Sequence, residues 1–225
     1  MEENNCFIYG KKIVPGIFLE RGNELKFKRN QIIYYPGQLL EGILIVTEGR
    51  VENFIYSSNG NSKIFFIFGP GSIIGETNIF ANVPNPLYYK ASDNSKALYV
   101  SRNTLVDILK TDYNAVEYLM ESMAKKVVTF YYQTNDLTFG EAETRVCNTL
   151  IQLAKYYEKK NSDNTVSLNI KITHQFLSDI LGINRTTASK IAISLKKQNL
   201  INVKSGKYII TDIDKLSAYN KAITE

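Results

Sequence analysis

Short apolar runs alternate with turn residues over the first half of the chain, up to residue 111. Each run is short enough for one strand and ends near Gly, Pro, Asn or Ser, the residues that favour turns. The runs cover residues 31–35, 42–47, 50–56, 63–68, 87–91 and 97–101. This spacing predicts an all-β jelly roll or sandwich, whose interior is a natural cavity for a small molecule.

A different pattern follows between Asp112 and Leu137, where the chain contains no Gly or Pro. Apolar side chains recur there at alternating spacings of four and three, the heptad pattern of a helix that pairs with another helix. Tyr118 and Leu119 widen the stripe on one side, so we expect one face to form a homodimer and its flank to cover the roll. The alternative is a helix packed only on its own domain. The predicted seam comprises Val116, Met120, Met123, Val127, Phe130, Thr134 and Leu137.

The last third of the chain reads as a helical domain. One helix is predicted over Glu141–Lys159, and two shorter ones follow at residues 174–181 and Arg185–Gln198. Gly182 lies in the tight turn between the two short helices, where it adopts a positive φ without steric cost. Asn184 stands where an N-cap belongs, and we expect its side chain to accept a hydrogen bond from the next turn. The inner face of the last helix is predicted to carry Ala188, Ile191 and Leu195.

Two β-like runs, Ile201–Lys204 and Lys207–Ile210, come directly after these helices and are joined by Ser205-Gly206. Short runs separated by such a pair predict a β-hairpin. Two helices around a tight turn, followed by a hairpin, make a winged helix-turn-helix.

The free face of the last helix carries small hydroxyls and long cations, which suit the major groove of DNA. The expected base contacts are Arg185, Thr186, Ser189 and Lys190, and the expected backbone contacts are His174, Thr187 and Lys197. The alternative is a helical hairpin with a solvated cationic face. The two-helix, turn and hairpin order favours DNA binding.

Charge separates the chain in the same place. The 225 residues carry a net charge of +5. From Thr138 onward there are 13 basic and 8 acidic residues, and the remainder has 14 of each. A neutral domain joined to a basic one is typical of a polyanion-binding protein. The predicted organisation is an effector-sensing roll at residues 1–111, a dimerisation helix at 112–137 and the DNA-binding domain at 138–225.

Cysteine and histidine are scarce: the chain has Cys6, Cys147 and His174. These cannot form a zinc finger or a cysteine-rich cluster, so no metal is expected. Cys147 falls on an apolar helix face, whereas a redox role for Cys6 stays open. We find no set of nucleophile, base and orienting group, so the chain is not expected to be an enzyme. No apolar run approaches the ~20 residues that cross a bilayer and no signal peptide is evident, so a cytoplasmic protein without membrane partners is expected.

Three motifs stand out in the first half of the chain: Tyr35-Pro36-Gly37, ILIVTEGRV at residues 43–51 and FGPGSIIGE at residues 68–76. They resemble the cyclic AMP receptor/FNR (Crp/Fnr) family of regulators. The resemblance covers nearly the whole chain and implies an α+β fold: a cyclic-nucleotide-binding-like roll, a long dimerisation helix and a winged helix-turn-helix. It also implies a homodimeric transcription regulator whose partners are double-stranded DNA, RNA polymerase and a small effector, with no resident cofactor.

The sequence departs from the cyclic AMP-binding members at one pair of residues. Gly75-Glu76 matches their Gly-Glu pair, but Asn85-Pro86 stands where their Arg-Ser or Arg-Thr pair belongs, and no arginine occurs between Arg50 and Arg102. A buried phosphate without a guanidinium loses its main charge partner, so we expect no cyclic-nucleotide dependence. The clusters required by iron–sulfur and haem members are absent too.

An aromatic-rich roll remains, which fits a small aromatic or carboxylate effector. The expected pocket comprises Tyr56, Phe66, Gly75, Glu76, Tyr88, Tyr89, Tyr131 and Tyr132, with Lys63 and Lys90 as anion partners. The Tyr131-Tyr132 pair resembles one on the long helix of the chlorophenol-sensing branch of the family. The alternative is a regulator of the same fold that needs no small ligand and responds to thiol state or to a protein partner.

Thr186 bears on DNA sequence preference. Many members of the family carry Glu at this position, where it accepts from the cytosine amine. Thr makes no such demand, so an A/T-leaning half-site is expected.

Overall fold

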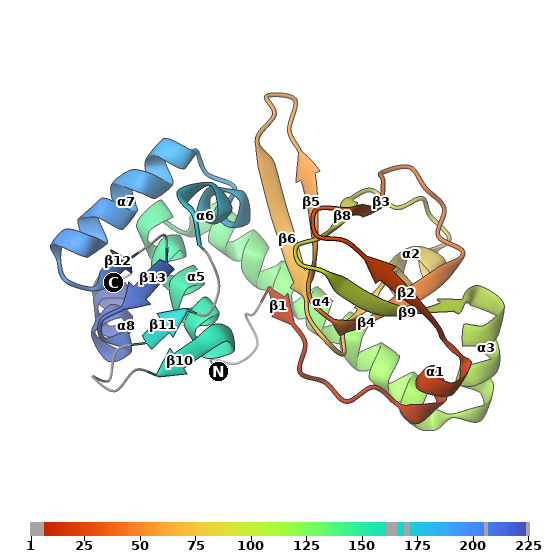
Figure 1. Cartoon of the computed structure of the whole chain (residues 1–225). Helices are drawn as coiled ribbons and strands as arrows, with labels where there is room; N and C mark the ends of the chain where they lie inside the picture. The colour runs from red at the N-terminus through yellow and green to blue at the C-terminus, as the bar shows by residue number, and fades with distance from the viewer. Residues whose placement is uncertain (1–6, 161–165, 169–171, 205–206, 224–225) are drawn as a thin grey trace. The chain divides into compact units, whose positions relative to one another are not determined.

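The computed structural model describes residues 7–160, 166–168, 172–204 and 207–223 (Figure 1). The chain forms two compact units, one comprising Met1–Ile55 and Ile64–Tyr131, the other Tyr56–Lys63 and Tyr132–Glu225. The division falls within the long helix α4, Tyr113–Phe139. The predicted α+β architecture of roll, long helix and winged helix-turn-helix is confirmed.

The first unit is a roll of two β-sheets. One sheet has the order β1-β6-β5-β8-β3, formed by Ile8–Tyr9, Ser62–Phe68, Val51–Tyr56, Tyr88–Ala91 and Ile32–Tyr34. The other has the order β2-β9-β4-β7, formed by Asn23–Phe27, Ser95–Ser101, Gly42–Glu48 and Ile73–Ile74. The pairing of β1 with β6 is parallel. Strand β9 pairs antiparallel with β2 and β4, β8 with β3 and β5, and β7 with β4.

Strand β4 shows why the roll has two apolar cores. Successive side chains of a strand point to opposite faces. Ile43 and Ile45 therefore enter one buried cluster, while Leu44 and Val46 enter the other. Burial on both faces explains why this stretch reads as a continuous apolar run.

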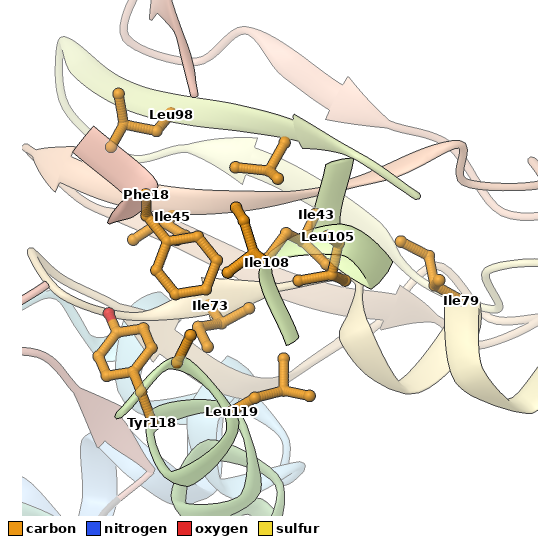
Figure 2. Close-up of a cluster of buried hydrophobic side chains, with 12 residues drawn as sticks. Phe18, Ile43, Ile45, Ile73, Ile79, Leu98, Leu105, Ile108, Tyr118 and Leu119 are labelled. Atoms are coloured by element: carbon orange, nitrogen blue, oxygen red, sulfur yellow. The ribbon is translucent and has the colours of Figure 1, made fainter. Parts of the chain in front are cut away.

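The first cluster joins the β4 sheet to helices (Figure 2). It collects Phe18 from α1 (Gly16–Arg21), Leu105 and Ile108 from α3 (Arg102–Thr111), and Tyr118 and Leu119 from α4. Figure 2 shows Tyr118 and Leu119 projecting from their helix toward Phe18 and Ile73. Each fully buried Leu or Ile stabilises the fold by about 1.5–3 kcal/mol, so this part of α4 is firmly anchored to the roll.

The six predicted strand regions are confirmed, but several short elements were not predicted. Strand β2 has mostly exposed side chains, so it lacks the apolar alternation that marks a strand. Helix α3 begins at an N-cap signal, since Ser101 Oγ accepts from the Thr104 amide at 3.2 Å. The two-residue strands β1 and β7 and the short helix α2 (Glu76–Ala81) are too brief for a periodic pattern.

The second unit contains α5, α6, α7 and α8, which span Ala142–Tyr157, His174–Leu181, Arg185–Lys197 and Ile213–Ala222. A sheet of order β10-β11-β13-β12 completes it, formed by Glu158–Lys160, Val166–Leu168, Lys207–Ile210 and Ile201–Lys204. Figure 1 shows α6 and α7 on one side of α5, and the short strands and α8 on the other. The hairpin strands have the predicted bounds, while Ser205-Gly206 and Cys6 lie outside the described residues.

The core of this unit combines the predicted inner faces of α5, α6 and α7 with Ile210 of the hairpin and Leu216 of α8, a helix that was not predicted. Its fully buried side chains include Val146, Leu150, Leu153, Leu177, Ala188, Leu195, Ile210 and Leu216. Cys147 is also buried, and burial raises the pKa of its thiol to about 12. A thiol with so high a pKa is unreactive near neutral pH, which agrees with the predicted packing role.

No helix in the described parts of the chain is both long and apolar enough to cross a membrane.

Candidate DNA interface and effector domain

The turn between α6 and α7 is fixed by local hydrogen bonds. Thr173 Oγ1 caps α6 by accepting from the Phe176 amide at 3.0 Å. Gly182 ends α6 in the left-handed region with φ of 64°, as predicted. Asn184 does occupy the N-cap position of α7, but its side chain makes no capping hydrogen bond, so that part of the prediction is wrong.

Helix α7 separates a buried face from an exposed one. Ala188, Ala192 and Leu195 are buried, and Ile191 is only half-buried. The exposed face carries most of the predicted DNA contacts: Arg185, Thr186, Lys190 and Lys197 are exposed, and Thr187 and Ser189 are half-buried. His174 is half-buried at the start of α6, with its ring edge-on to Tyr208 at 6.3 Å between centroids.

One residue of this face was missed by sequence reasoning. Ile193 is 51% exposed on α7. The search for an apolar inner face gave no reason to single it out, since Ile191 and Leu195 lie on either side in sequence. The burial pattern alone distinguishes it.

Glu76 and Lys126 form a buried ion pair inside the first unit. Gly75 precedes α2 with φ of 96°, and Glu76 begins that helix with its side chain buried. Lys126 Nζ reaches Glu76 Oε1 from α4 and also donates to the Ile73 carbonyl at 2.8 Å. Ser122 Oγ donates to the same carboxylate oxygen at 3.3 Å. The glutamate that matches the family's hydroxyl-binding position therefore already has a cationic partner.

Asn85 has a structural task. Its side chain is fully buried, and its Nδ2 donates to the Tyr35 carbonyl at 3.1 Å and to the Leu87 carbonyl at 2.5 Å. Its Oδ1 accepts from the Leu87 amide at 3.1 Å. Its backbone amide donates to the Gln38 carbonyl at 2.8 Å. These bonds tie two loops together and use both side-chain donors of Asn85.

The two lysines predicted as anion partners are also engaged. Lys90 Nζ lies 2.6 Å from Glu52 Oε1. Lys63, which belongs to the second unit, donates to the Ile180 carbonyl, and burial lowers its pKa to about 8.

The predicted aromatic residues fall into three environments. Phe66 and Tyr89 are buried in the second apolar cluster, and burial raises the pKa of Tyr89 to about 12. Tyr88 is half-buried and stacks on Phe54 at 5.3 Å between centroids. Tyr56, Tyr131 and Tyr132 are exposed.

A cavity of about 280 Å³ lies elsewhere in the first unit. Three segments enclose it: Ile8 to Lys12, Gly71 to Ile73, and α4 between Tyr118 and Thr129. Tyr118 Oη donates to the Gly71 carbonyl at 2.7 Å, and Tyr9 Oη lies 2.7 Å from Thr129 Oγ1. None of the eight predicted pocket residues lines this cavity. Glu76 lies behind the lining, where it accepts hydrogen bonds from the lining residues Lys126 and Ser122.

Charges around the cavity are unequal. Lys12, Lys125 and Lys126 line it. Glu121 pairs with both Lys12 and Lys125, which hold the pKa of its carboxyl below the usual value, and Glu76 pairs with Lys126. Three cations therefore face two carboxylates. Ser72, also in the lining, has a buried Oγ without a hydrogen-bond partner among the described residues.

Sequence reasoning missed Lys126 because it searched α4 for apolar side chains. The face of α4 that meets the roll carries Ala115, Tyr118, Leu119, Lys126 and Thr129, which are all buried. The helical spacing of these residues was readable, but a lysine is normally assigned to the surface. Its burial depends on Glu76, fifty positions away in the sequence.

The predicted dimer seam follows another face of α4. Met120 is 64% exposed and Val127 is 47% exposed, while Phe130 and Leu137 are also exposed. Val116 and Met123 are half-buried, and Met123 packs against the first apolar cluster. Phe130 packs against the roll, where its ring meets that of Phe66 edge-on with 4.9 Å between the ring centroids.

Comparison with known proteins agrees with this organisation. The cyclic nucleotide-binding domain family matches residues 24–112, and the Crp-like helix-turn-helix domain family matches residues 144–219. The roll and the helix-turn-helix thus define a DNA-binding transcription regulator with an effector-binding domain. The chain belongs to the Crp/Fnr family.

Individual relatives are distant but align over most of their length. The cAMP-activated global transcriptional regulator CRP of Salmonella typhimurium is 24% identical over 194 residues, which are 86% of this chain and 91% of that protein. The solved structure of TTHA1359, a CRP/FNR family regulator from Thermus thermophilus, matches with a TM-score of 0.75 and 21% identity, covering 88% of this chain and 98% of that one. A structure of CprK complexed with OCPA matches with a TM-score of 0.70 and 20% identity, covering 90% and 91%.

Proposed function

We propose that this chain is a dimeric, sequence-specific DNA-binding regulator whose roll responds to a small anionic ligand and does not depend on cyclic nucleotides. The observation that carries the proposal is the state of the Glu76 and Asn85 positions. Glu76 is neutralised by Lys126, and the Asn85 side-chain amide is committed to loop carbonyls.

A cyclic nucleotide finds poor partners in this arrangement. Its phosphate needs a positioned cation, and burying a phosphate charge without one is costly. Arg50 is a half-buried arginine of the roll, but its Nε lies 2.5 Å from Asp93 Oδ2, so it already has an acidic partner. The cyclic AMP dependence named for the Salmonella relative therefore does not extend to this chain.

The cavity beside α4 supports a small monoanion as the effector. Its volume of about 280 Å³ lies just below the range of roughly 300–1,000 Å³ for typical ligand sites, which favours a compact ligand. A lysine ammonium has three donors, and Lys126 uses two of them on Glu76 and Ile73. The third donor and the Ser72 hydroxyl suit a carboxylate. Glu76 already matches Lys126, so the charge of the ligand would be compensated by Lys12 and Lys125, which share the single carboxylate of Glu121.

Ligand binding here has a physical route to DNA binding. Lys126 and Tyr118 lie on α4, the helix that also carries the proposed dimer seam. A ligand shifts the equilibrium only if it binds the DNA-competent arrangement more tightly than the other, and the shift equals that difference in affinity. Contacts with α4 are where such a difference would arise.

Calorimetry with cyclic AMP and cyclic GMP tests the first part, and micromolar binding of either would overturn it. Thermal unfolding with benzoate and phenylacetate tests the second, because a ligand at 100 times its Kd stabilises the folded state by about 2.7 kcal/mol. The double variant Lys126→Met/Glu76→Leu should lose this stabilisation, while Lys96→Met, on a solvent-facing pair with Glu48, should keep it.

The alternative is a regulator that needs no small ligand and responds to a protein partner or to thiol state, and the thiol form can be tested directly. The buried Cys147 is a poor sensor because of its raised pKa, so the thiol form rests on Cys6. A Cys6→Ser variant with unchanged DNA binding under oxidising and reducing conditions would remove it.

A further inference from the structure

Ile193 lies at the centre of the exposed face of α7. An α-helix turns by about 100° per residue, so positions three, four and seven apart share a face. Thr186, Lys190 and Lys197 stand seven before, three before and four after Ile193. Leu195 and Ala188, on the opposite side, are buried. The half-exposed isoleucine is therefore surrounded by the residues that face DNA.

An apolar side chain in this place needs an apolar partner. When α7 enters the major groove, Ile193 is covered by base edges or by phosphates. If Ile193 packed against the polar atoms of the bases or phosphates, it would displace the water bound to those atoms without replacing the lost hydrogen bonds. The thymine C5-methyl is the methyl group that the major groove offers.

We propose that Ile193 is a specificity-determining residue that packs against the C5-methyl of one thymine in each half-site. The neighbouring side chains fit this role. Lys197, one turn after Ile193, is an exposed cation that can reach a phosphate, and Lys190, one turn before it, is an exposed residue expected to contact a base. Ser189 is small and half-buried, so it does not hold the helix away from the bases.

This inference rests on DNA binding by α7, but it is independent of the effector. It also differs from the A/T preference expected from Thr186, which arises because Thr186 does not select cytosine as a glutamate would. Ile193 is proposed to select thymine directly, by packing against its methyl group. A surface for a protein partner is the competing explanation, but protein interfaces are marked by contiguous apolar patches, and the face around Ile193 is cationic and hydroxylated.

The test begins with duplexes selected from a random library by the full-length protein. Each thymine of the selected site is then replaced singly by deoxyuridine, which lacks only the methyl group. One position per half-site should weaken binding about fourfold, the value of one buried methyl group. With Ile193→Ala this penalty should disappear, and with Ile193→Val it should largely remain. Leu19→Ala, at an exposed leucine of α1, is the matched control and should keep the full penalty.

Three results would overturn the proposal. The first is that the wild-type protein tolerates deoxyuridine at every thymine position, a result that does not depend on the folding of any variant. The second is that the penalty persists unchanged in Ile193→Ala. The third is that this variant loses affinity equally for all sequences, as expected when a phosphate-contacting residue is removed. If the library yields no preferred site, the failure lies in sequence-specific DNA binding itself, and this inference is rejected with it.

Discussion

At the scale of single residues, Glu76 and Lys126 are the most consequential pair in the roll. Both side chains are buried, so each charge depends on the other for neutralisation. Removing one partner of a buried pair strands the other charge, which typically costs 3–5 kcal/mol, whereas replacing both by apolar residues is often neutral.

Lys126→Met should therefore lower the free energy of unfolding by about 3–5 kcal/mol, measured by urea denaturation. The double variant Lys126→Met/Glu76→Leu should recover most of that loss, because no charge remains stranded. Lys96→Met is the control and should change little, since its partner Glu48 is exposed. Equal destabilisation by the single and double variants would show that the pair contributes through packing alone.

Sequence reasoning at this scale succeeded where chemistry follows local spacing. The exposed face of α7 could be predicted because helical periodicity separates Lys190 from Leu195, whereas its contacts with DNA stay a prediction. Asn85-Pro86 was recognised as a departure, but the Asn85 hydrogen bonds depend on loops that only the fold brings together. Lys126 was missed for the same reason, because its partner is remote in sequence.

At the scale of elements, α4 has two faces in different environments. Tyr118, Leu119 and Lys126 anchor it to the roll. Met120 and Val127 project from another face and remain exposed in the single chain. A seam of this kind is stable when a second helix covers it.

The variant Met120→Glu/Val127→Glu should be monomeric in sedimentation experiments, because four carboxylates would meet in the dimer seam. Phe130 is left unchanged, since its contact with Phe66 would confuse loss of dimerisation with damage to the roll. Tyr113→Glu, at an exposed residue at the start of α4, is the control and should remain dimeric. A dimeric double variant would show that the seam is assigned to the wrong residues.

Elements with a strong apolar period were predicted well, and those that bury few apolar side chains were not. α5 and α7 bury several side chains each, so their patterns are clear. α8 was not predicted, because Leu216 is its one buried residue among those described. Its start was readable nonetheless, since Asp212 caps it by accepting from the Asp214 and Lys215 amides.

At the scale of the whole molecule, the excess positive charge belongs to the DNA-binding part of the sequence. DNA binding by such a domain releases counterions, and the logarithm of the association constant falls with the logarithm of salt concentration by about 0.9 for each phosphate contacted. The slope of this log–log plot therefore reports the number of phosphate contacts made by all the protein chains bound to one DNA duplex.

Lys197→Ala should reduce that slope by about 1.8, because a dimer presents this lysine to phosphate twice. A monomer on DNA would lose only about 0.9, so the same measurement reports how many chains are bound. Lys215→Ala is the control: it removes an exposed lysine from α8, away from the α7 face, and should leave the slope unchanged. Fluorescence anisotropy with a selected duplex at several salt concentrations gives both slopes. An unchanged slope with Lys197→Ala would remove this residue from the DNA contacts, and a reduction near 0.9 would contradict the proposed dimer.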